Sequence, residues 1–344
     1  MKHYFFYFSF LFLFLFLINS ILYKLEIFIH KNSINIHKIF GVDKVPLSGG
    51  VYFFFVIVYL SLNFNLININ YIFYIFLYLA LGLVVDQNIN LGPKFRFILQ
   101  SMFTFFLVYF NELYVLKTNI FLIDYFLDNR LFLIFFTSFC IMVLINGTNF
   151  IDGVNNNVSG LYLLIIFSLI IIEYENSILI NIYSHLIFLI SILIFHIFNF
   201  FNRNYLGDSG AYILSVISSI LIISFINKSH FVSPILAVNI FWYPAFETLF
   251  SIIRKIKFKI NPFFPDSMHM HTLILRFLKY KKIKNYNSLS GFIINLFLIP
   301  NFIMSINFFN NTKILFITTL LYIFFYILIY IKIYNFLDNK KLFN

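Results

Sequence analysis

Three aspartates beside very apolar segments are the residues of this sequence that could do chemistry. Asp86 ends one apolar run, Asp152 follows another, and Asp208 precedes a third. A carboxylate at the centre of a membrane helix costs about 2.5 to 3.5 kcal/mol on the insertion scale. Ionisable groups in such surroundings usually mark a pathway or a functional site. The three aspartates are therefore predicted to mark a transport pathway, a metal site or a catalytic site at the ends of membrane helices.

The second aspartate belongs to a motif in which Asn146, Asn149 and Asp152 are spaced by three. On a helix, residues three apart lie on one face. Three oxygen-bearing side chains on one face suit a hard cation such as Mg²⁺. A polar loop at a helix end explains the same residues equally well, because Asn is frequent along the whole chain. The spacing alone leaves both interpretations open.

The third aspartate lies in Leu206-Gly207-Asp208-Ser209-Gly210, directly before an apolar run. Asp208 is placed to cap the following helix, and the flanking glycines would let the backbone approach a ligand closely. Free N–H groups at a helix start also attract phosphate. A plain helix cap is the alternative, and it is compatible with a ligand site.

Basic residues and histidines form the remaining candidates. Lys94 follows Asp86 at the start of the next apolar run, with Arg96 interpreted as a marker of the membrane surface. His269 and His271 are followed by Arg276, and this group suits phosphate better than zinc because the segment has no Cys and no third His. A solvated basic loop is the alternative.

Three other histidines receive plainer interpretations. His37, before Pro46, reads alone as part of a turn. His185 and His196 lie in one apolar run and are predicted to make buried hydrogen bonds between helices.

Composition predicts an all-α, polytopic membrane bundle that forms a single domain over residues 1–344. The chain is 61% hydrophobic and 11% charged, whereas soluble proteins carry about 25% charged residues. Its net charge of +11 is not assigned to nucleic-acid binding, because no soluble segment carries it. About 20 apolar residues span a bilayer. The eleven predicted spans are 4–23, 50–67, 68–86, 95–113, 129–146, 159–173, 177–197, 209–227, 231–250, 287–307 and 313–335. Ten spans are the alternative, because the boundary between the second and third is weak.

The distribution of charge predicts the orientation. Most of the 24 Lys and Arg residues fall in alternate loops, and basic loops stay in the cytoplasm. The N-terminus is then outside and the C-terminus inside. The loops that carry the aspartate, asparagine and histidine motifs all fall on the cytoplasmic face, which predicts one site there.

Taken in order along the chain, these motifs resemble the polyprenyl-phosphate sugar-1-phosphate transferases, glycosyltransferase family 4, which are related to the phospho-MurNAc-pentapeptide translocases. The matching elements are His37 with Pro46 and Gly49-Gly50, an acidic residue before Pro93-Lys94, the Asn-x-x-Asn-x-x-Asp-Gly of 146–153, the Leu-Gly-Asp-x-Gly of 206–210, and His269-x-His271. They cover residues 37–276, and two further spans at 287–335 match in topology.

The resemblance implies an Mg²⁺-dependent transferase of the bacterial inner membrane, with Mn²⁺ as a substitute metal. Such an enzyme moves a sugar-1-phosphate, N-acetylhexosamine-1-phosphate by default, from a UDP-sugar to undecaprenyl phosphate and releases UMP, which begins the synthesis of a cell-surface glycan. The lipid bilayer is a further partner, and a homodimer is compatible with the family. The implied metal ligands are Asp208 and Asn149. The implied catalytic residues are Asp86, Asp152 and Asp208, and the implied substrate-binding residues are His37, Lys94, Asn146, His269, His271 and Arg276.

The sequence departs from the family pattern at two places. The acidic pair is reduced to Asp86, flanked by Val85 and Gln87, and the last His of the histidine motif is Thr272. The first departure puts a mechanism with two carboxylates in doubt, and the second weakens the fit to the pentapeptide-carrying branch. Together they suggest the alternative of an inactive family member, against which the retained Asn and Gly-Asp motifs speak. A transporter or flippase is the other alternative, because intramembrane carboxylates also line transport pathways.

Overall fold

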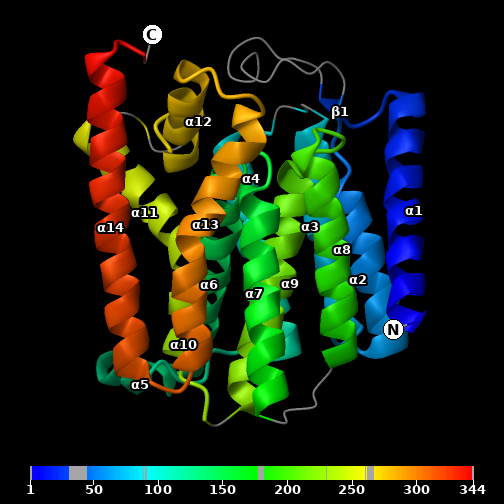
Figure 1. The fold of residues 1–344 in the computed structure, drawn as a ribbon. Coiled ribbons are helices and arrows are strands. Elements are labelled where there is room, and N and C mark those ends of the chain that lie inside the picture. The colour runs from blue at the N-terminus through cyan, green and yellow to red at the C-terminus, as the bar shows by residue number, and fades with distance from the viewer. Residues whose placement is uncertain are drawn as a thin grey trace.

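Most apolar runs of the sequence fold into helices that run along one common axis (Figure 1). The computed structural model describes residues 2–30, 45–87, 89, 91–176, 182–229, 231–259, 261 and 267–342. The helices are α1 Lys2–Leu25, α2 Gly49–Phe64, α3 Asn70–Asp86, α4 Pro93–Asn111, α5 Phe121–Leu127, α6 Arg130–Ile151, α7 Asn157–Glu175, α8 Ile182–Phe200, α9 Gly207–Lys228, α10 Ile235–Ile240, α11 Trp242–Lys257, α12 Met270–Tyr280, α13 Tyr286–Asn307 and α14 Thr312–Asn339. His37 lies outside the described residues.

A short two-stranded antiparallel pairing joins the segment after α1 to the segment before α2. Strand β1 is Ile29–His30 and strand β2 is Val45–Pro46. Leu47 continues from β2 into a bridge with Tyr205, just before α9. This contact ties the start of α2 to the start of α9.

Seven of the described helices are long and apolar enough to cross a membrane: α1, α6, α7, α8, α9, α13 and α14. Helices α2 and α3 are shorter apolar helices. The chain is therefore a polytopic helical membrane protein, as predicted. The weak boundary between the second and third predicted spans falls where α2 ends, at Asn65 in the left-handed conformation. The number of spans and the orientation of the termini remain predictions.

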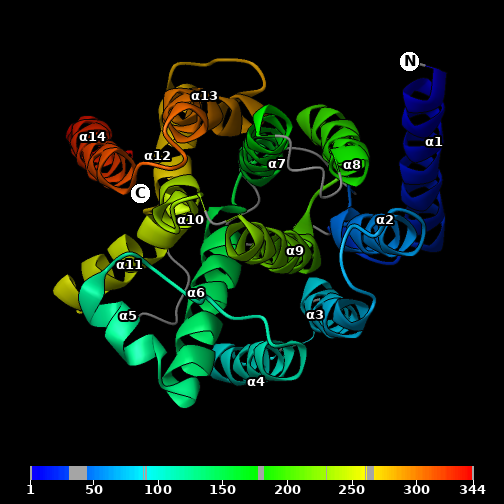
Figure 2. The same cartoon turned by 90° about the horizontal axis from the view of Figure 1, so that it is seen from below.

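The ninth predicted span, 231–250, was wrong as one continuous helix. The structure divides it into α10 and α11 at Phe241, and α11 lies across the bundle axis (Figure 2). Pro244 has no N–H and restricts the residue before it, which disfavours a continuous helix. The carbonyl oxygen of Asn239, beside the break, accepts a hydrogen bond from Asn301 Nδ2 at 2.9 Å. Side-chain contacts of Asn239 with Thr318 and Thr319 of α14 also hold the break in place.

Helix α9 lies at the centre of the bundle (Figure 2). Nearly nine tenths of its apolar stretch is buried by the surrounding helices. Its first turns carry small residues, which let neighbouring helices approach closely. A methyl group at Gly82 of α3 would lie 2.2 Å from Cα of Ser209, so α3 and α9 touch at that point. The close crossing brings the end of α3 to the start of α9.

The helix ends that carry the predicted motifs gather at one end of the bundle, here called the motif end. Helices α3 and α6 finish there, and α7 and α9 begin there (Figure 1). The first residues of α1 lie at the opposite end of the bundle, while α14 finishes at the motif end.

The two histidines of α8, His185 and His196, make the predicted hydrogen bonds between helices. His185 is buried and His196 is half-buried. His185 Nδ1 lies 2.9 Å from Glu173 Oε2. His196 lies 2.8 Å from Asn156 Nδ2 and 2.9 Å from Ser159 Oγ. Both histidines therefore join α8 to α7.

Candidate active site

The carboxylate of Asp86 caps the start of α9. Its Oδ1 accepts from the backbone N–H of Asp208 at 2.8 Å. Its Oδ2 accepts from the N–H of Ser209 at 3.3 Å and from the Ser209 hydroxyl at 2.6 Å. The first N–H groups of a helix have no partner inside the helix, so a carboxylate from α3 supplies one. Asp86 thereby fixes the backbone that carries Asp208.

Gly207 makes this capping possible. Its φ is +74°, in the left-handed region, and a methyl group there would lie 2.8 Å from both carboxylate oxygens of Asp86. A side chain at this position would strain the backbone and displace the carboxylate. The glycine in the 206–210 motif is thus explained by the close approach of Asp86.

Asp208 collects partners from three helices. Arg96 of α4 donates to its Oδ2 at 3.1 Å, and the hydroxyl of Tyr212, one turn along α9, donates to the same oxygen at 3.1 Å. The side chain of Asn149, at the end of α6, lies close to the Asp208 carboxylate. The structure therefore brings together the two residues, Asp208 and Asn149, that the resemblance implies as metal ligands.

Asp152 lies directly after α6, within electrostatic reach of the other two aspartates. Burial raises its pKa well above the ordinary value, and the charges of Asp208 and Asp86 raise it further. When three carboxylates lie close together with few cations to balance them, each disfavours the ionisation of the others. The cluster Asp86, Asn149, Asp152 and Asp208, with Arg96, is here called the carboxylate half of the site.

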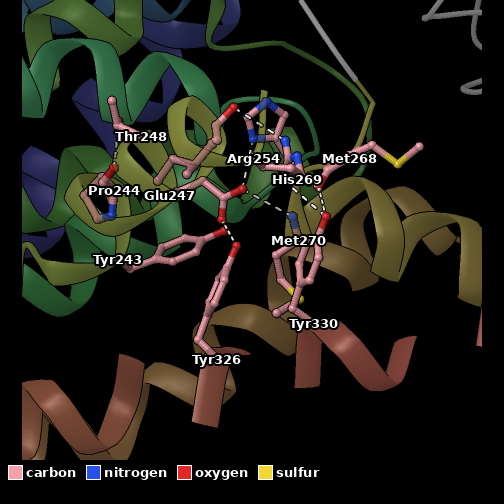
Figure 3. Close-up of polar contacts among 12 residues, drawn as sticks. Tyr243, Pro244, Glu247, Thr248, Arg254, Met268, His269, Met270, Tyr326 and Tyr330 are labelled. Carbon is pink, nitrogen blue, oxygen red and sulfur yellow. Dashed lines mark hydrogen bonds and ion pairs between the residues drawn. The ribbon is translucent and has the colours of Figure 1, made fainter. Parts of the chain in front are cut away.

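A second cluster is built around Glu247 of α11, which is fully buried. Its Oε1 lies 2.9 Å from His269 Nδ1 and accepts from the backbone N–H of Met270 at 3.3 Å. Its Oε2 accepts from the hydroxyl of Tyr326 on α14. Figure 3 shows these side chains converging on the Glu247 carboxylate from α11, α14 and the start of α12.

The residue before His269 is held by a parallel set of contacts. The carbonyl oxygen of Met268 accepts from Arg254 Nη1 at 2.8 Å and from the hydroxyl of Tyr330 at 2.9 Å. Arg254 also lies over the ring of Phe250, 5.7 Å from its centroid. The rings of His269 and His271 stack at 5.5 Å with an angle of 10°. Residues 247, 254, 268–271, 326 and 330 are here called the histidine half.

One turn of chain, residues 149–153, joins the two halves. Asn149 and Asp152 belong to the carboxylate half. Between and after them, the ring of Phe150 lies 5.7 Å from that of His269. A methyl group at Gly153 would lie only 2.1 Å from His271 Nε2. The Asp-Gly pair of the motif is thus explained: the aspartate serves one half, and the glycine leaves room for the other.

Other predicted site residues lie less centrally. Arg276 donates to Ser267 Oγ at 2.8 Å, beside the histidine segment, and burial lowers its pKa. Asn146 donates to the Met142 carbonyl of its own helix at 2.9 Å. Lys94 is exposed at the start of α4. The roles predicted for these residues stay predictions.

Sequence reasoning missed several residues of the site, among them Arg96, Glu247 and Tyr326. Arg96 was interpreted as a surface marker, yet it pairs with Asp208. Glu247 and Tyr326 were given no role, although they contact the histidine segment. For Glu247 a signal existed, because it is the one acidic residue between 231 and 253, and isolated intramembrane carboxylates usually have a function. Tyr326 had no such signal among the many aromatic residues.

The donor atoms of the carboxylate half fit a magnesium ion. They are carboxylate and amide oxygens, which are the ligands that Mg²⁺ prefers. Among the described residues, no three His, Cys, Asp or Glu side chains are close enough to hold an ion together. Mg²⁺ is commonly bound by one or two carboxylates, with substrate phosphates and water completing its shell, so a sparse protein contribution suits it.

Residues 68–226 match the family model described as glycosyl transferase family 4. These residues are a family 4 segment. The predicted family resemblance is confirmed. The family 4 segment contains the whole carboxylate half and ends before the histidine half begins.

Curated relatives carry related names. The undecaprenyl-phosphate alpha-N-acetylglucosaminyl 1-phosphate transferase of Escherichia coli K12 is 24% identical over 199 residues, which cover 56% of this chain and 54% of that protein. Its Yersinia pestis namesake is 24% identical over 147 residues, 41% of this chain and 40% of that protein. The Bacillus subtilis protein named "Probable undecaprenyl-phosphate N-acetylglucosaminyl 1-phosphate transferase" is 28% identical over 134 residues, 38% of this chain and 37% of its own length. This chain thus spans about half the length of the relatives it matches.

Proposed function

We propose that the protein transfers an N-acetylhexosamine-1-phosphate from a UDP-sugar to undecaprenyl phosphate and releases UMP. One observation carries this proposal: Asn149 and Asp208 meet at the start of a buried helix, and the turn 149–153 joins them to a pair of stacked histidines. Oxygen donors beside imidazole and guanidinium groups form an arrangement suited to a diphosphate. The relatives' printed names support the choice of acceptor and sugar.

In the proposed reaction, a phosphate oxygen of the lipid attacks the β-phosphorus of the UDP-sugar. A new bond forms between that oxygen and the β-phosphorus. The bond between the β-phosphorus and the oxygen that bridges it to the α-phosphorus breaks, and UMP leaves with the electron pair. Phosphoryl transfer of this kind depends mainly on positioning and on neutralising charge. A magnesium ion on Asp208 and Asn149 would supply positive charge at the diphosphate. His269, His271 and Arg276 would bind the donor from the other half.

We assign Asp86 a positioning role in this reaction. Its two carboxylate oxygens already accept hydrogen bonds from Asp208 and Ser209. A phosphate monoester has a second pKa near 6 and is largely ionised at neutral pH, so the acceptor needs little help from a base. This reading also explains how a single aspartate at 86 can suffice where the family pattern has a pair.

The proposed orientation follows from charge. Basic residues are concentrated at the motif end, including Arg254 and Lys255 in the last turn of α11, near the histidine segment. By the positive-inside rule, the motif end faces the cytoplasm, the N-terminus is outside and the C-terminus inside. A cytoplasmic site would meet UDP-sugars where they are made.

The experiment that tests the function is UMP release by purified protein in detergent. The protein is given undecaprenyl phosphate and a panel of UDP-N-acetylhexosamines, with and without Mg²⁺, beside Asp208→Asn. Glu173→Gln, at the opposite end of the bundle, is the matched control. Metal-dependent release that is lost only in Asp208→Asn is the expected result.

Two alternatives make different predictions in the same experiment. An inactive family member would bind nucleotide without releasing UMP from any donor. A transporter would release no UMP and would move a labelled substrate across proteoliposomes. Either outcome, from folded protein and with an active relative as positive control, would reject the proposed reaction.

A further inference from the structure

The Glu247 carboxylate caps the start of α12 and contacts the histidine beside that start. Its Oε1 receives the backbone N–H of Met270, the first residue of α12, at 3.3 Å and lies 2.9 Å from His269 Nδ1. Both oxygens of Glu247 accept from other donors, Oε1 from Met270 N–H and Oε2 from the Tyr326 hydroxyl, which favours the ionised carboxylate. An ionised carboxylate can only accept, so the hydrogen bond to His269 then needs the proton on Nδ1 of the ring.

The second oxygen of Glu247 is fixed from another direction. Oε2 accepts from the hydroxyl of Tyr326 on α14. Glu247 and Tyr326 are both buried, as is His269. A buried carboxylate with all its donors in place has little freedom to rotate, since each rotation would leave a buried polar group without its partner. The carboxylate is thus held in the plane that suits His269.

From these contacts we infer that Glu247 and Tyr326 are positioning residues that keep the proton of His269 on Nδ1, so that any second proton sits on Nε2, where it donates to the donor diphosphate. This inference rests on the proposed function for the identity of the diphosphate, but not for the position of the proton. A carboxylate that orients a functional histidine in this way commonly fixes its tautomer and ring direction.

The same contacts bring α14 into the site. Tyr326 and Tyr330 are one helical turn apart on α14. Tyr326 holds Glu247, and Tyr330 donates to the carbonyl oxygen of Met268 at 2.9 Å. Helix α14 thus contacts Met268 directly through Tyr330 and supports His269 and Met270 indirectly through Glu247 (Figure 3).

The direct test is ¹⁵N NMR of histidine-labelled protein in detergent, with the His269 signals identified by their loss in His269→Gln. The inference expects Nδ1 to be protonated in the metal-free, ligand-free protein, and Nε2 to gain a proton when a UDP-sugar and Mg²⁺ are added. Protonation of the neutral ring on Nε2 alone would overturn it. This readout needs no turnover, so it stands even if the proposed reaction fails.

Variants at 247 separate the acceptor atom from the negative charge. In Glu247→Gln the amide oxygen can still accept from Met270 and His269, while the amide NH₂ faces the Tyr326 oxygen. Nδ1 protonation should persist. Glu247→Met has a similar volume and no comparable acceptor, so the ring should shift toward the Nε2-protonated tautomer. The expected loss in kcat/KM is about tenfold to a hundredfold for Glu247→Met, the range for removing a group that orients a functional histidine, and smaller for Glu247→Gln.

The chain supplies its own control in Glu173, which pairs with His185 Nδ1 at the same 2.9 Å but at the opposite end of the bundle. Glu173→Met should leave KM for the UDP-sugar unchanged, whereas Glu247→Met should raise it. Equal losses in the two variants would mean that Glu247 only supports folding, and would overturn the inference.

Tyr326→Phe covers the case in which Glu247→Met does not fold. It removes one hydroxyl and leaves the ring packed against Phe246 and Phe250. It should broaden or shift the His269 signals and raise KM for the UDP-sugar. Unchanged His269 signals and an unchanged KM in Tyr326→Phe would remove Tyr326 from the positioning set. Wild-type protein that shows the predicted proton on Nδ1 but releases no UMP would reject the proposed function and keep the proton assignment.

Discussion

In both the carboxylate half and the histidine half a carboxylate caps the start of a helix, but the charge around the two carboxylates differs. In each, a carboxylate from an earlier helix receives the first N–H groups of a later one: Asp86 caps α9, and Glu247 caps α12. The second oxygen of Glu247 accepts a hydrogen bond from Tyr326. Asp86, in contrast, has two other carboxylates near it, those of Asp152 and Asp208. Burial raises the pKa of Asp152, and repulsion from the other two carboxylates raises it further.

This difference indicates a division of labour. The histidine half is complete within the protein, because its charges and donors are matched before a ligand arrives. The carboxylate half carries negative charge in excess of what Arg96 balances, so a cation would relieve it. The first half would serve as a rigid support for the donor, and the second as the place where positive charge is added.

The largest effect is expected from removing the cap of α9. Asp86→Ala leaves two backbone N–H groups and the Ser209 hydroxyl without their acceptor, and should lower the free energy of unfolding by about 3 kcal/mol, since each unsatisfied buried donor costs about 1 to 3 kcal/mol. Asp86→Asn keeps one acceptor oxygen and should lose less. Thermal unfolding followed by circular dichroism in detergent measures both.

Trp242 shows whether that loss is shared by the other half. It is the one tryptophan of the chain and lies in α11, with its ring 6.2 Å from that of Tyr326. If the halves unfold together, the midpoint from tryptophan fluorescence should fall with the midpoint from circular dichroism. A fluorescence midpoint that stays at the wild-type value would mean that the two halves are independent units.

An intermediate effect is expected at the junction. Gly153→Ala would place a methyl group 2.1 Å from His271 Nε2, so the turn or the histidine must move, at about 1 to 3 kcal/mol for overpacking. KM for the UDP-sugar, measured by UMP release, should rise. Gly92→Ala is the matched control, because a methyl group there meets nothing within 4 Å. Equal behaviour of the two variants would disprove the contact between the halves.

The smallest effect concerns the pH dependence of stability. Because the folded-state pKa of Asp152 is raised, the folded protein binds more protons than the unfolded chain between the two pKa values. The free energy of unfolding of metal-free protein should then fall as pH rises above about 4, the ordinary aspartate pKa. Asp152→Asn should weaken this decline, as shown by thermal midpoints across pH in the presence of EDTA. A steeper decline in the variant would contradict the assigned direction.

The fold was predictable where the signal was local. Apolar runs indicate helices on their own, because a lipid-facing backbone must satisfy its hydrogen bonds internally. The broken ninth span had one local signal, Pro244, which disfavours a continuous helix. Its break is also held by contacts between Asn239 and residues 62 to 80 positions later, which no local pattern indicates. Hydropathy alone reads 231–250 as a single apolar segment.

The same distinction applies to the site. Asn149 and Asp208 stand in short motifs, and the structure brings them together as predicted. Glu247 contacts a histidine 22 positions away and a tyrosine 79 positions away. No local pattern links those residues. The alternation of basic loops indicated which helix ends share a face, but not which side chains would touch there.

Helix α14 begins at Thr312, beyond every motif that the sequence displays. A shortened chain that kept residues 1–311 would still contain each aspartate, asparagine and histidine discussed above. It would lose the hydroxyls that hold Glu247 and Met268. Such a chain would contain every motif of the sequence, yet its histidine segment would lack the contacts with Tyr326 and Tyr330. For anyone dividing this protein into fragments or grafting its site onto another bundle, the minimal unit is therefore defined by contacts and not by signatures.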